Sequence, residues 1–412
     1  MQKNSSYYKK TKFACYYTFL AMSSAFSLPP ILFLTFRQMY FISYTLLGTL
    51  VLTNFCTQLI VDLIFSFFTK YFNIQKTIQI MPLLTSLGFL VYAIVPTLFP
   101  QYAYAGLFSG TVIFSIAAGL CEVLLSPLIA AIPSKTPEKD MSLLHSLYAY
   151  GVVSVVIIST VFLKIFGNEN WMYLTLFLAV LPIISSLLFF TSPFPPINIS
   201  GNSSNTTVKQ NSGLFLCVIC IFLGGAAENA MTNWISSYLE SALHISKTLG
   251  DILGFTMFAV LLGLGRTLYA KYEKNISTVL LGGMFGATIC YLIAGLSPIP
   301  LLSMLACILT GLCTSMLWPG TLILMEEKFP NPGVTAYALM AAGGDLGGSV
   351  APQMLGAIVD SVSTSSWAET LGNKLSLTAE QIGMKTGMLT ATIFPILGVI
   401  ILIIIKKTFA KR

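Results

Sequence analysis

Two carboxyl side chains stand in the middle of apolar stretches of the chain, where an ionised group is costly to keep. Glu122 lies within GLCEVLLSP and Glu228 within GGAAENAMTNWISSYL. A carboxyl group in such surroundings can bind a proton or accept a hydrogen bond from a hydroxyl group of a polar solute. Both are therefore candidate binding groups. The structural alternatives are a protonated Glu122 bonded to a neighbouring helix and a polar packing seam at Glu228.

Polar and aromatic side chains accompany Glu228 at helical spacing. Asn229 and Asn233 are four residues apart and so share one face of a helix, and Trp234 follows them directly. An indole ring can pack on the flat apolar face of a sugar. We expect this cluster, together with Trp318 of a later apolar stretch, to contact a substrate.

A second polar stripe recurs at every fourth residue and consists of Asn54, Gln58 and Asp62. Asp62 precedes Lys70 by eight residues, which places it ~12 Å from the helix end at a rise of about 1.5 Å per residue. This depth is shallow for a central binding site. The stripe therefore predicts a gate or an interhelical clamp in preference to substrate contact.

Arg266 and Asp345 also lie inside apolar stretches. Arg266 stands close to Lys271 in GLGRTLYAK, and because it keeps its charge it needs a carboxylate or carbonyl oxygens beside it. Its depth resembles that of Asp62, which favours a gating role for both. Asp345 lies in AAGGDLGGS, where glycines permit close helix approach, and we expect a structural or gating role for it.

One histidine stands near the start of an apolar stretch. His145 lies in LLHSLYAYG, with Tyr148 about one helical turn later. Imidazole titrates near physiological pH, so His145 could relay a proton to or from Glu122. Equally, it could be a neutral side chain bonded to a backbone carbonyl near the helix start.

The composition indicates which kind of structural element carries these polar side chains. Of the 412 residues, 55% are hydrophobic and 9% are charged, against about 25% charged in soluble domains. The mean hydropathy is +0.82. These values exclude a soluble globular domain and a disordered chain, and predict a polytopic membrane protein. The net charge of +7 comes from residues between apolar runs, so no nucleic-acid surface is expected.

Apolar runs long enough to cross a bilayer recur along the whole chain. We predict twelve spanning helices, at about 13–35, 41–68, 77–98, 102–131, 141–166, 171–191, 213–239, 248–270, 277–297, 299–325, 333–359 and 385–405. Most of the 22 Lys and Arg residues then fall on the side of both termini, whereas Arg37, Lys164, Lys247, Lys374 and Lys385 fall on the other. This bias predicts cytoplasmic N- and C-termini in a multi-pass protein of the plasma membrane.

The two halves of the chain repeat a motif. GLCEVLLSP at 119–127 returns as GLCTSMLWP at 311–319, and Leu147, Ala149 and Gly151 match Leu339, Ala341 and Gly343 at the same offset. The pattern predicts an all-α fold of two parallel six-helix repeats, 1–191 and 213–412, joined by a polar cytoplasmic linker at 192–212. Such repeats place a cavity between the halves.

No known catalytic signature is present in the sequence. We find no H-E-x-x-H, G-x-S-x-G or Walker motif. The eight cysteines are scattered, and Cys217 and Cys220 stand one helical turn apart within an apolar stretch. We therefore expect no enzyme activity, no cofactor and no metal ion, and we assign the cysteines to helix packing.

Twelve helices in a 6+6 parallel repeat with a central linker resemble the major facilitator superfamily. Within it, GLCEVLLSP, LLHSLYAYG and AENAMTNWISSYL look like the fucose/proton symporter branch. The resemblance implies that Glu122 is the proton-coupled carboxylate. It also places His145 and Tyr148 at sugar-contacting positions, and Glu228 with Trp234 at the pattern of the seventh span.

We therefore predict a secondary active transporter that couples a proton to the symport of a small, polar, sugar-like solute by alternating access. It would act in the lipid bilayer as a monomer. A multidrug/proton antiporter of the same fold is the first alternative. The second is a receptor or assembly protein that does not transport.

Overall fold

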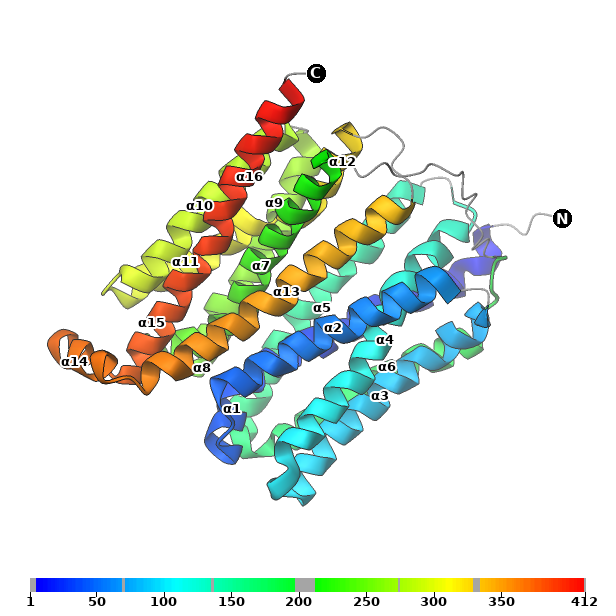
Figure 1. Ribbon diagram of the computed structural model, residues 1–412. Coiled ribbons are helices and arrows are strands. Elements are labelled where there is room, and N and C mark those ends of the chain that lie inside the picture. Colours follow the sequence, from blue (N-terminus) through cyan, green and yellow to red (C-terminus); the bar gives the residue numbers. More distant parts are fainter. Residues whose placement is uncertain are drawn as a thin grey trace. The chain divides into compact units, whose positions relative to one another are not determined.

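The computed structural model describes residues 5–68, 71–134, 137–196, 212–272, 275–328 and 334–410. Every regular element among these residues is a helix, as the all-α prediction requires (Figure 1). In a bilayer a helix satisfies its own backbone N–H and C=O groups, so long apolar sequences can only adopt this form or a closed barrel.

Six long helices follow one another in the N-terminal part. They are α1 (Lys9–Tyr40), α2 (Tyr44–Phe68), α3 (Ile74–Leu98), α4 (Ala103–Ala131), α5 (Pro137–Phe166) and α6 (Trp171–Phe190). Short 3-10 turns at Ser5–Tyr8, Pro100–Tyr102 and Asn168–Asn170 precede α1, α4 and α6.

The C-terminal part contains more breaks. Its helices are α7 (Ser212–Ser241), α8 (Lys247–Leu249), the π-helix η5 (Gly250–Thr256), α9 (Met257–Tyr272), α10 (Ile276–Leu296), α11 (Pro300–Thr314), α12 (Leu317–Lys328), α13 (Val334–Ser363), α14 (Ser366–Leu375), α15 (Ala379–Ala391) and α16 (Ile393–Ala410). Three predicted spans are thus built from consecutive pieces: α8–η5–α9, α11–α12 and α15–α16.

Among the described residues, eleven helical segments are long and apolar enough to cross a membrane. The twelfth predicted span, at 333–359, corresponds to α13, which is long enough but is richer in glycine and polar residues. The short helix α14 was not predicted. Lys385, which the sequence placed in an outer loop, instead lies within α15 and donates a hydrogen bond to the carbonyl oxygen of Ser297 at 2.8 Å.

Contacts divide the chain into two compact units. The first unit is Met1–Phe41 with Cys56–Gly201, and the second unit is Ile42–Phe55 with Asn202–Arg412. The start of α2 belongs to the second unit because Asp360 of α13 accepts hydrogen bonds from the backbone N–H groups of Tyr44 (3.1 Å) and Thr45 (2.6 Å). A carboxylate at a helix N-terminus is favoured by the unpaired N–H groups there.

Glycines related by the sequence repeat occupy equivalent packing positions in the two units, which confirms the parallel repeat. Gly119 of α4 lies against Gln58 of α2, and its partner Gly311 of α11 lies against Phe258 of α9. Likewise, Gly151 of α5 packs on α1, and Gly343 of α13 packs on α7. The same helix pairs therefore meet at the same motif in each unit.

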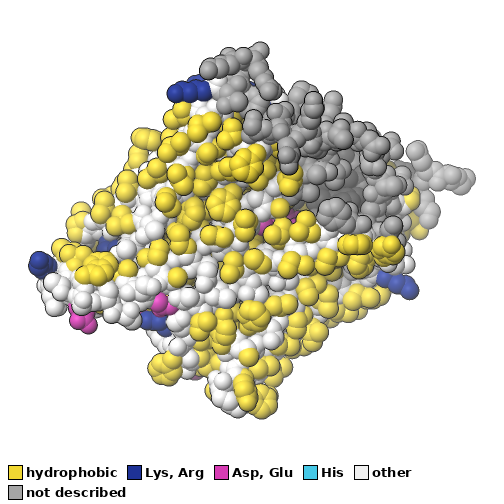
Figure 2. Space-filling view, viewed as in Figure 1, with side chains coloured by type: hydrophobic (Ala, Val, Ile, Leu, Met, Phe, Trp, Pro, Cys, Tyr) yellow, Lys and Arg dark blue, Asp and Glu magenta, His cyan; other side chains and the backbone are white. Residues whose placement is uncertain are grey.

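The cores of the units are apolar side chains contributed by neighbouring helices. In the first unit one cluster joins α1 to α4 through Phe19, Met22, Ala118, Leu125 and Leu128. Many other large apolar side chains are exposed, as expected for helices that face lipid, and they cover much of the surface seen in Figure 2. The cysteines are free thiols, mostly buried, within the helices.

Candidate functional site

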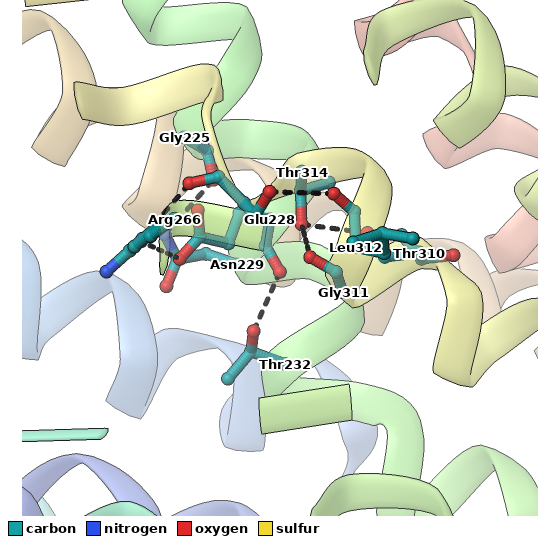
Figure 3. Close-up of polar contacts among 10 residues, drawn as sticks. Gly225, Glu228, Asn229, Thr232, Arg266, Thr310, Gly311, Leu312 and Thr314 are labelled. Atoms are coloured by element: carbon teal, nitrogen blue, oxygen red, sulfur yellow. Dashed lines mark hydrogen bonds and ion pairs between the residues drawn. The ribbon is translucent and has the colours of Figure 1, made fainter. Parts of the chain in front are cut away.

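The clearest polar site in the second unit joins α7 to α9. Glu228 of α7 and Arg266 of α9 form an ion pair, with 3.5 Å between Oε1 and Nη2 (Figure 3). The glutamate side chain is 15% exposed and the arginine side chain 40% exposed. We expected Arg266 to need a carboxylate or carbonyl oxygens beside it, and it has one of each. The carboxylate is that of Glu228, and the Nε of Arg266 also donates to the carbonyl oxygen of Ser315 at 3.0 Å.

The carbonyl of Ser315 is available because of a proline. In a continuous helix this oxygen would accept a hydrogen bond from the N–H of residue 319, but Pro319 has none. The chain breaks here between α11 and α12, and the guanidinium of Arg266 takes the vacant acceptor. Pro319 is the last residue of the repeated motif, so the sequence already held the signal for this contact.

The second carboxyl oxygen of Glu228 is the open part of the site. Oε2 is buried and accepts no hydrogen bond from any described residue. Buried polar atoms are nearly always hydrogen-bonded, so this acceptor indicates a partner from outside the described residues. A proton bound to Oε2, or a hydroxyl group donated by a small solute, would satisfy it.

The side chains beside Glu228 form a ladder along α7. Asn229 Nδ2 donates to the carbonyl of Gly225 (3.1 Å), Thr232 Oγ1 donates to that of Glu228 (2.9 Å), and Asn233 Nδ2 donates to that of Asn229 (2.9 Å). Each amide therefore uses a donor within its own helix. The predicted shared face is present, and contact of Asn229 and Asn233 with a substrate stays a prediction.

Trp234 does not form the predicted open aromatic plate. Its ring is fully buried, its Nε1 donates to the carbonyl of Pro352 at 3.0 Å, and it packs on Tyr44 with ring centroids 5.5 Å apart. Trp234 therefore joins α7 to α13 and α2 in this structure. An indole ring often lines a binding cavity, but Trp234 lies on a face of α7 that packs against other helices. Trp318 is half-buried and lies close to Gly225 and Gly344.

In the first unit the structure brings together two acids that the sequence kept apart. Glu122 of α4 is exposed and Asp62 of α2 is half-buried, and their carboxyl groups are near enough for their charges to interact. The contact follows from Gly119, which lets α4 lie directly on Gln58 and Val61 of α2. Asp62 is thus a neighbour of Glu122 as well as a residue of the predicted gate.

The remaining predicted positions divide between the two units. Gln58 is buried in the first unit and Asn54 in the second. Tyr148 is half-buried and meets Phe26 edge to face at 5.6 Å, and the side chain of His145 lies outside the described residues. Roles of these residues in gating or binding stay predictions.

Asp345 is buried in α13 beside glycines that bring α13 onto α7. A Cβ atom at Gly225 of α7 would lie 2.6 Å from the carbonyl oxygen of Gly344, and one at Gly347 would collide with the carbonyl of Phe222. The expectation that these glycines permit close helix approach is confirmed. The role of Asp345 itself stays a prediction.

One buried acid was missed by the sequence analysis. Asp251 in η5 is fully buried, accepts a hydrogen bond from Ser236 of α7, and pairs with Lys247 at 3.4 Å. It lies inside the predicted span 248–270, so its charge within an apolar run was the available signal. Among the described residues, no three His, Cys, Asp or Glu side chains gather closely enough to hold a metal ion.

The family of the chain follows from the comparison with known proteins. The family model of the Major Facilitator Superfamily matches residues 14–352. The chain therefore belongs to the Major Facilitator Superfamily, and is a multi-pass membrane transporter of that class. No curated protein matches the sequence.

Solved structures share the fold over nearly the entire chain. A bacterial homolog of the human lysosomal transporter Spinster, in an inward-facing and occupied conformation, aligns with a TM-score of 0.76 at 13% identity and covers 99% of each chain. A D-xylose–proton symporter aligns with a TM-score of 0.73 at 15% identity, over 94% of this chain and 97% of its own. The E. coli fucose:proton symporter aligns at 0.58 and 13% identity, over 95% and 99%. The predicted fucose branch is thus not singled out.

Proposed function

We propose that this transporter couples the inward movement of a proton to the symport of a small, polar, sugar-like solute. The observation that carries the proposal is the pair formed by Glu122 and Asp62. An ionised carboxylate within a membrane span must face water or a partner, because lipid cannot solvate it. Two carboxylates close together repel each other, and a single bound proton removes that repulsion.

The solute would bind to the polar groups of α7 and α9. Oε2 of Glu228 offers an open acceptor and the half-exposed guanidinium of Arg266 offers donors, which together match the hydroxyl groups of a sugar. The structural similarity to a D-xylose–proton symporter and to the fucose:proton symporter supports a solute of this class.

Coupling follows from the charge on the Glu122–Asp62 pair. An empty, fully ionised pair needs water around it, so closing the binding space over it is costly. Once a proton has bound, the pair carries less charge and this cost falls. The two halves then change their relative orientation and release both on the other side, as alternating access requires. Asp62, Arg266 and Asp345 would bias the gates.

The proposed setting is the plasma membrane, with both termini in the cytoplasm and the protein acting as a monomer. The distribution of Lys and Arg between loops supports this orientation. The motifs in α4, α5 and α7 support a place near the fucose/proton symporters, with His145 and Tyr148 of α5 at solute-contacting positions.

A transport screen tests the proposed function. Purified protein in proteoliposomes would be offered radiolabelled monosaccharides, nucleosides and cationic drugs, with and without an inwardly directed proton gradient. The proposal predicts gradient-dependent accumulation of at least one monosaccharide. Drug extrusion driven by protons would instead identify a multidrug antiporter. Failure to move any solute under either condition would identify a receptor or assembly protein and overturn the proposal.

A further inference from the structure

The short helix α14 (Ser366–Leu375) differs from all the long helices described. It connects α13 to α15 and is too short to cross a membrane. Figure 1 shows it at the end of α13 that lies away from the C-terminus, projecting sideways from the helices of its unit. It carries three large apolar side chains that are exposed, including Trp367 at 49% exposure.

The side chains of α14 are segregated by face. Trp367, Leu371 and Leu375 are exposed and spaced four residues apart, so they form one stripe along the helix. Ala368 and Gly372 lie beside this stripe and are buried. Ser366, Glu369, Thr370 and Asn373 occupy the remaining surface, and Lys374 lies at the border of the apolar stripe.

The buried positions fix α14 to the chain that follows it. The carbonyl oxygen of Gly372 accepts a hydrogen bond from the N–H of Leu377 at 2.9 Å, and a Cβ atom at Gly372 would collide with the carbonyl oxygen of Leu377. Thr378 then caps α15 in a capping box with Gln381. These contacts hold the orientation of α14 and leave its apolar stripe uncovered.

The position of α14 relative to the membrane spans follows from α15, the helix that comes directly after it. Lys385, less than two turns into α15, bonds to Ser297 at the end of α10. The exposed Leu296 and Ile299 stand beside Ser297, where the apolar spans Ile276–Leu296 and Pro300–Met325 end and begin. Only Ser376, Leu377 and Thr378 separate α14 from the span Ala379–Lys407, so the stripe of α14 lies next to the end of that span.

We propose that α14 is an interfacial helix that lies on the membrane surface, with Trp367, Leu371 and Leu375 inserted among the lipids on the side opposite the C-terminus. Helices with one apolar and one polar face bind in the interfacial plane, and Trp is favoured at that depth. Lys374, at the border of the stripe, can extend its ammonium group to the lipid headgroups. The surface fits lipid because its apolar stripe is uncovered and α14 directly precedes the span Ala379–Lys407.

Tryptophan fluorescence in reconstituted full-length protein tests this placement. The chain has four Trp residues. Trp171 and Trp234 are 1% and 0% exposed and Trp318 is half-buried, so Trp367, at 49% exposure, is the most exposed of the four. The protein would be placed in phosphatidylcholine vesicles brominated either near the headgroup end of the acyl chain or near its methyl end.

The expected result is stronger quenching by the shallow bromines than by the deep ones, with the difference removed in Trp367→Phe. A second variant, Leu371→Glu, should weaken the shallow quenching while the other three Trp residues report an intact fold. The proposal is overturned if Trp367 is quenched by aqueous acrylamide and not by brominated lipid. It is also overturned if lipid quenching appears only on dilution of the protein in the membrane, which would mean that a second copy covers the stripe.

Discussion

At the residue scale, the second unit holds a charged pair whose two partners are satisfied unequally. Arg266 is held by Glu228 and by the carbonyl of Ser315, which Pro319 leaves without a helical partner. Glu228 uses one oxygen for the ion pair and keeps the other open. A site with one saturated and one open member can bind a ligand without first breaking the pair.

Removing Arg266 from the Glu228–Arg266 ion pair should lower the stability of the protein. Arg266→Ala leaves the Glu228 carboxylate largely buried without its cation. We expect a loss of about 1–3 kcal/mol of stability, less than the ~3–5 kcal/mol of a fully buried pair, because Arg266 is 40% exposed. Thermal unfolding in detergent would measure it.

The double variant Glu228→Gln with Arg266→Ala should recover most of that stability, since no uncompensated charge remains. Thr267→Ala is a matched control, because Thr267 is exposed and its hydroxyl bonds only to Gly263 of its own helix turn among the contacts described. A double variant as unstable as Arg266→Ala alone would contradict the role assigned to the ion pair.

A second charged contact lies near the helix ends of the first unit, with Asp140 outside the span Leu147–Phe166. Asp140, near the start of α5, accepts contacts from Lys12 Nζ (2.5 Å) and Ser134 Oγ (2.6 Å). Burial by itself would raise the pKa of Asp140. Hydrogen bonds from Lys12, Ser134 and Tyr16, together with the positive charge of Lys12, outweigh burial and lower that pKa below its ordinary value. The contact is therefore present at neutral pH.

Because the pKa of Asp140 is lowered in the folded protein, its contribution is complete above the ordinary carboxyl pKa and is lost as the pH falls through the lowered value. Asp140→Asn should cost about 1 kcal/mol at neutral pH. The difference from wild type should shrink on acidification. Unfolding curves of both proteins from neutral to acid pH would measure this, with Glu369→Gln on the exposed face of α14 as control. A difference that grows toward acid pH would contradict the assignment.

At the element scale, glycines set how closely helices approach. α7 and α13 meet backbone to backbone through Gly225, Gly344 and Gly347, so the side chains that would separate them are absent. The same contact buries Trp234 between α7, α13 and α2. The position of α7, and of Glu228 on it, therefore depends on the close packing of α7 against α13.

Gly347→Ala should disrupt this contact, because the new methyl group would overlap the carbonyl of Phe222. We expect a loss of about 1–3 kcal/mol or more, as for overpacking elsewhere. Gly282→Ala in α10 is the matched control, since a Cβ atom there meets nothing within 4 Å. Alanine favours helix over glycine, so the control should be neutral or slightly stabilising. Equal effects of the two substitutions would exclude close packing as the reason for Gly347.

Elements were predictable to the extent that they follow from hydropathy. The spans were found because the bilayer demands about 20 apolar residues per helix. The break between α11 and α12, the π-helix η5 and the helix α14 were not predicted. The break depends on Pro319, and α14 is a short amphipathic sequence with low mean hydropathy, so neither appears in a search for long apolar runs.

At the scale of the whole molecule, the parallel repeat was readable from GLCEVLLSP and GLCTSMLWP, since each copy begins with a glycine at the same kind of helix contact. The composition of the candidate site was also largely predictable, because charges within spans are rare. Its geometry was not. The sequence did not predict that neighbouring helices bring Asp62 to Glu122 and bury Trp234.

The central claim is that a proton on Glu122 couples transport to the proton gradient. The most direct test compares Glu122→Gln with wild type in proteoliposomes, using the monosaccharide that the wild-type protein accumulates. Gradient-driven accumulation and solute exchange across the membrane at equal pH would both be measured. We predict that Glu122→Gln loses accumulation but retains exchange, since glutamine mimics the protonated form. Accumulation equal to wild type would contradict the account.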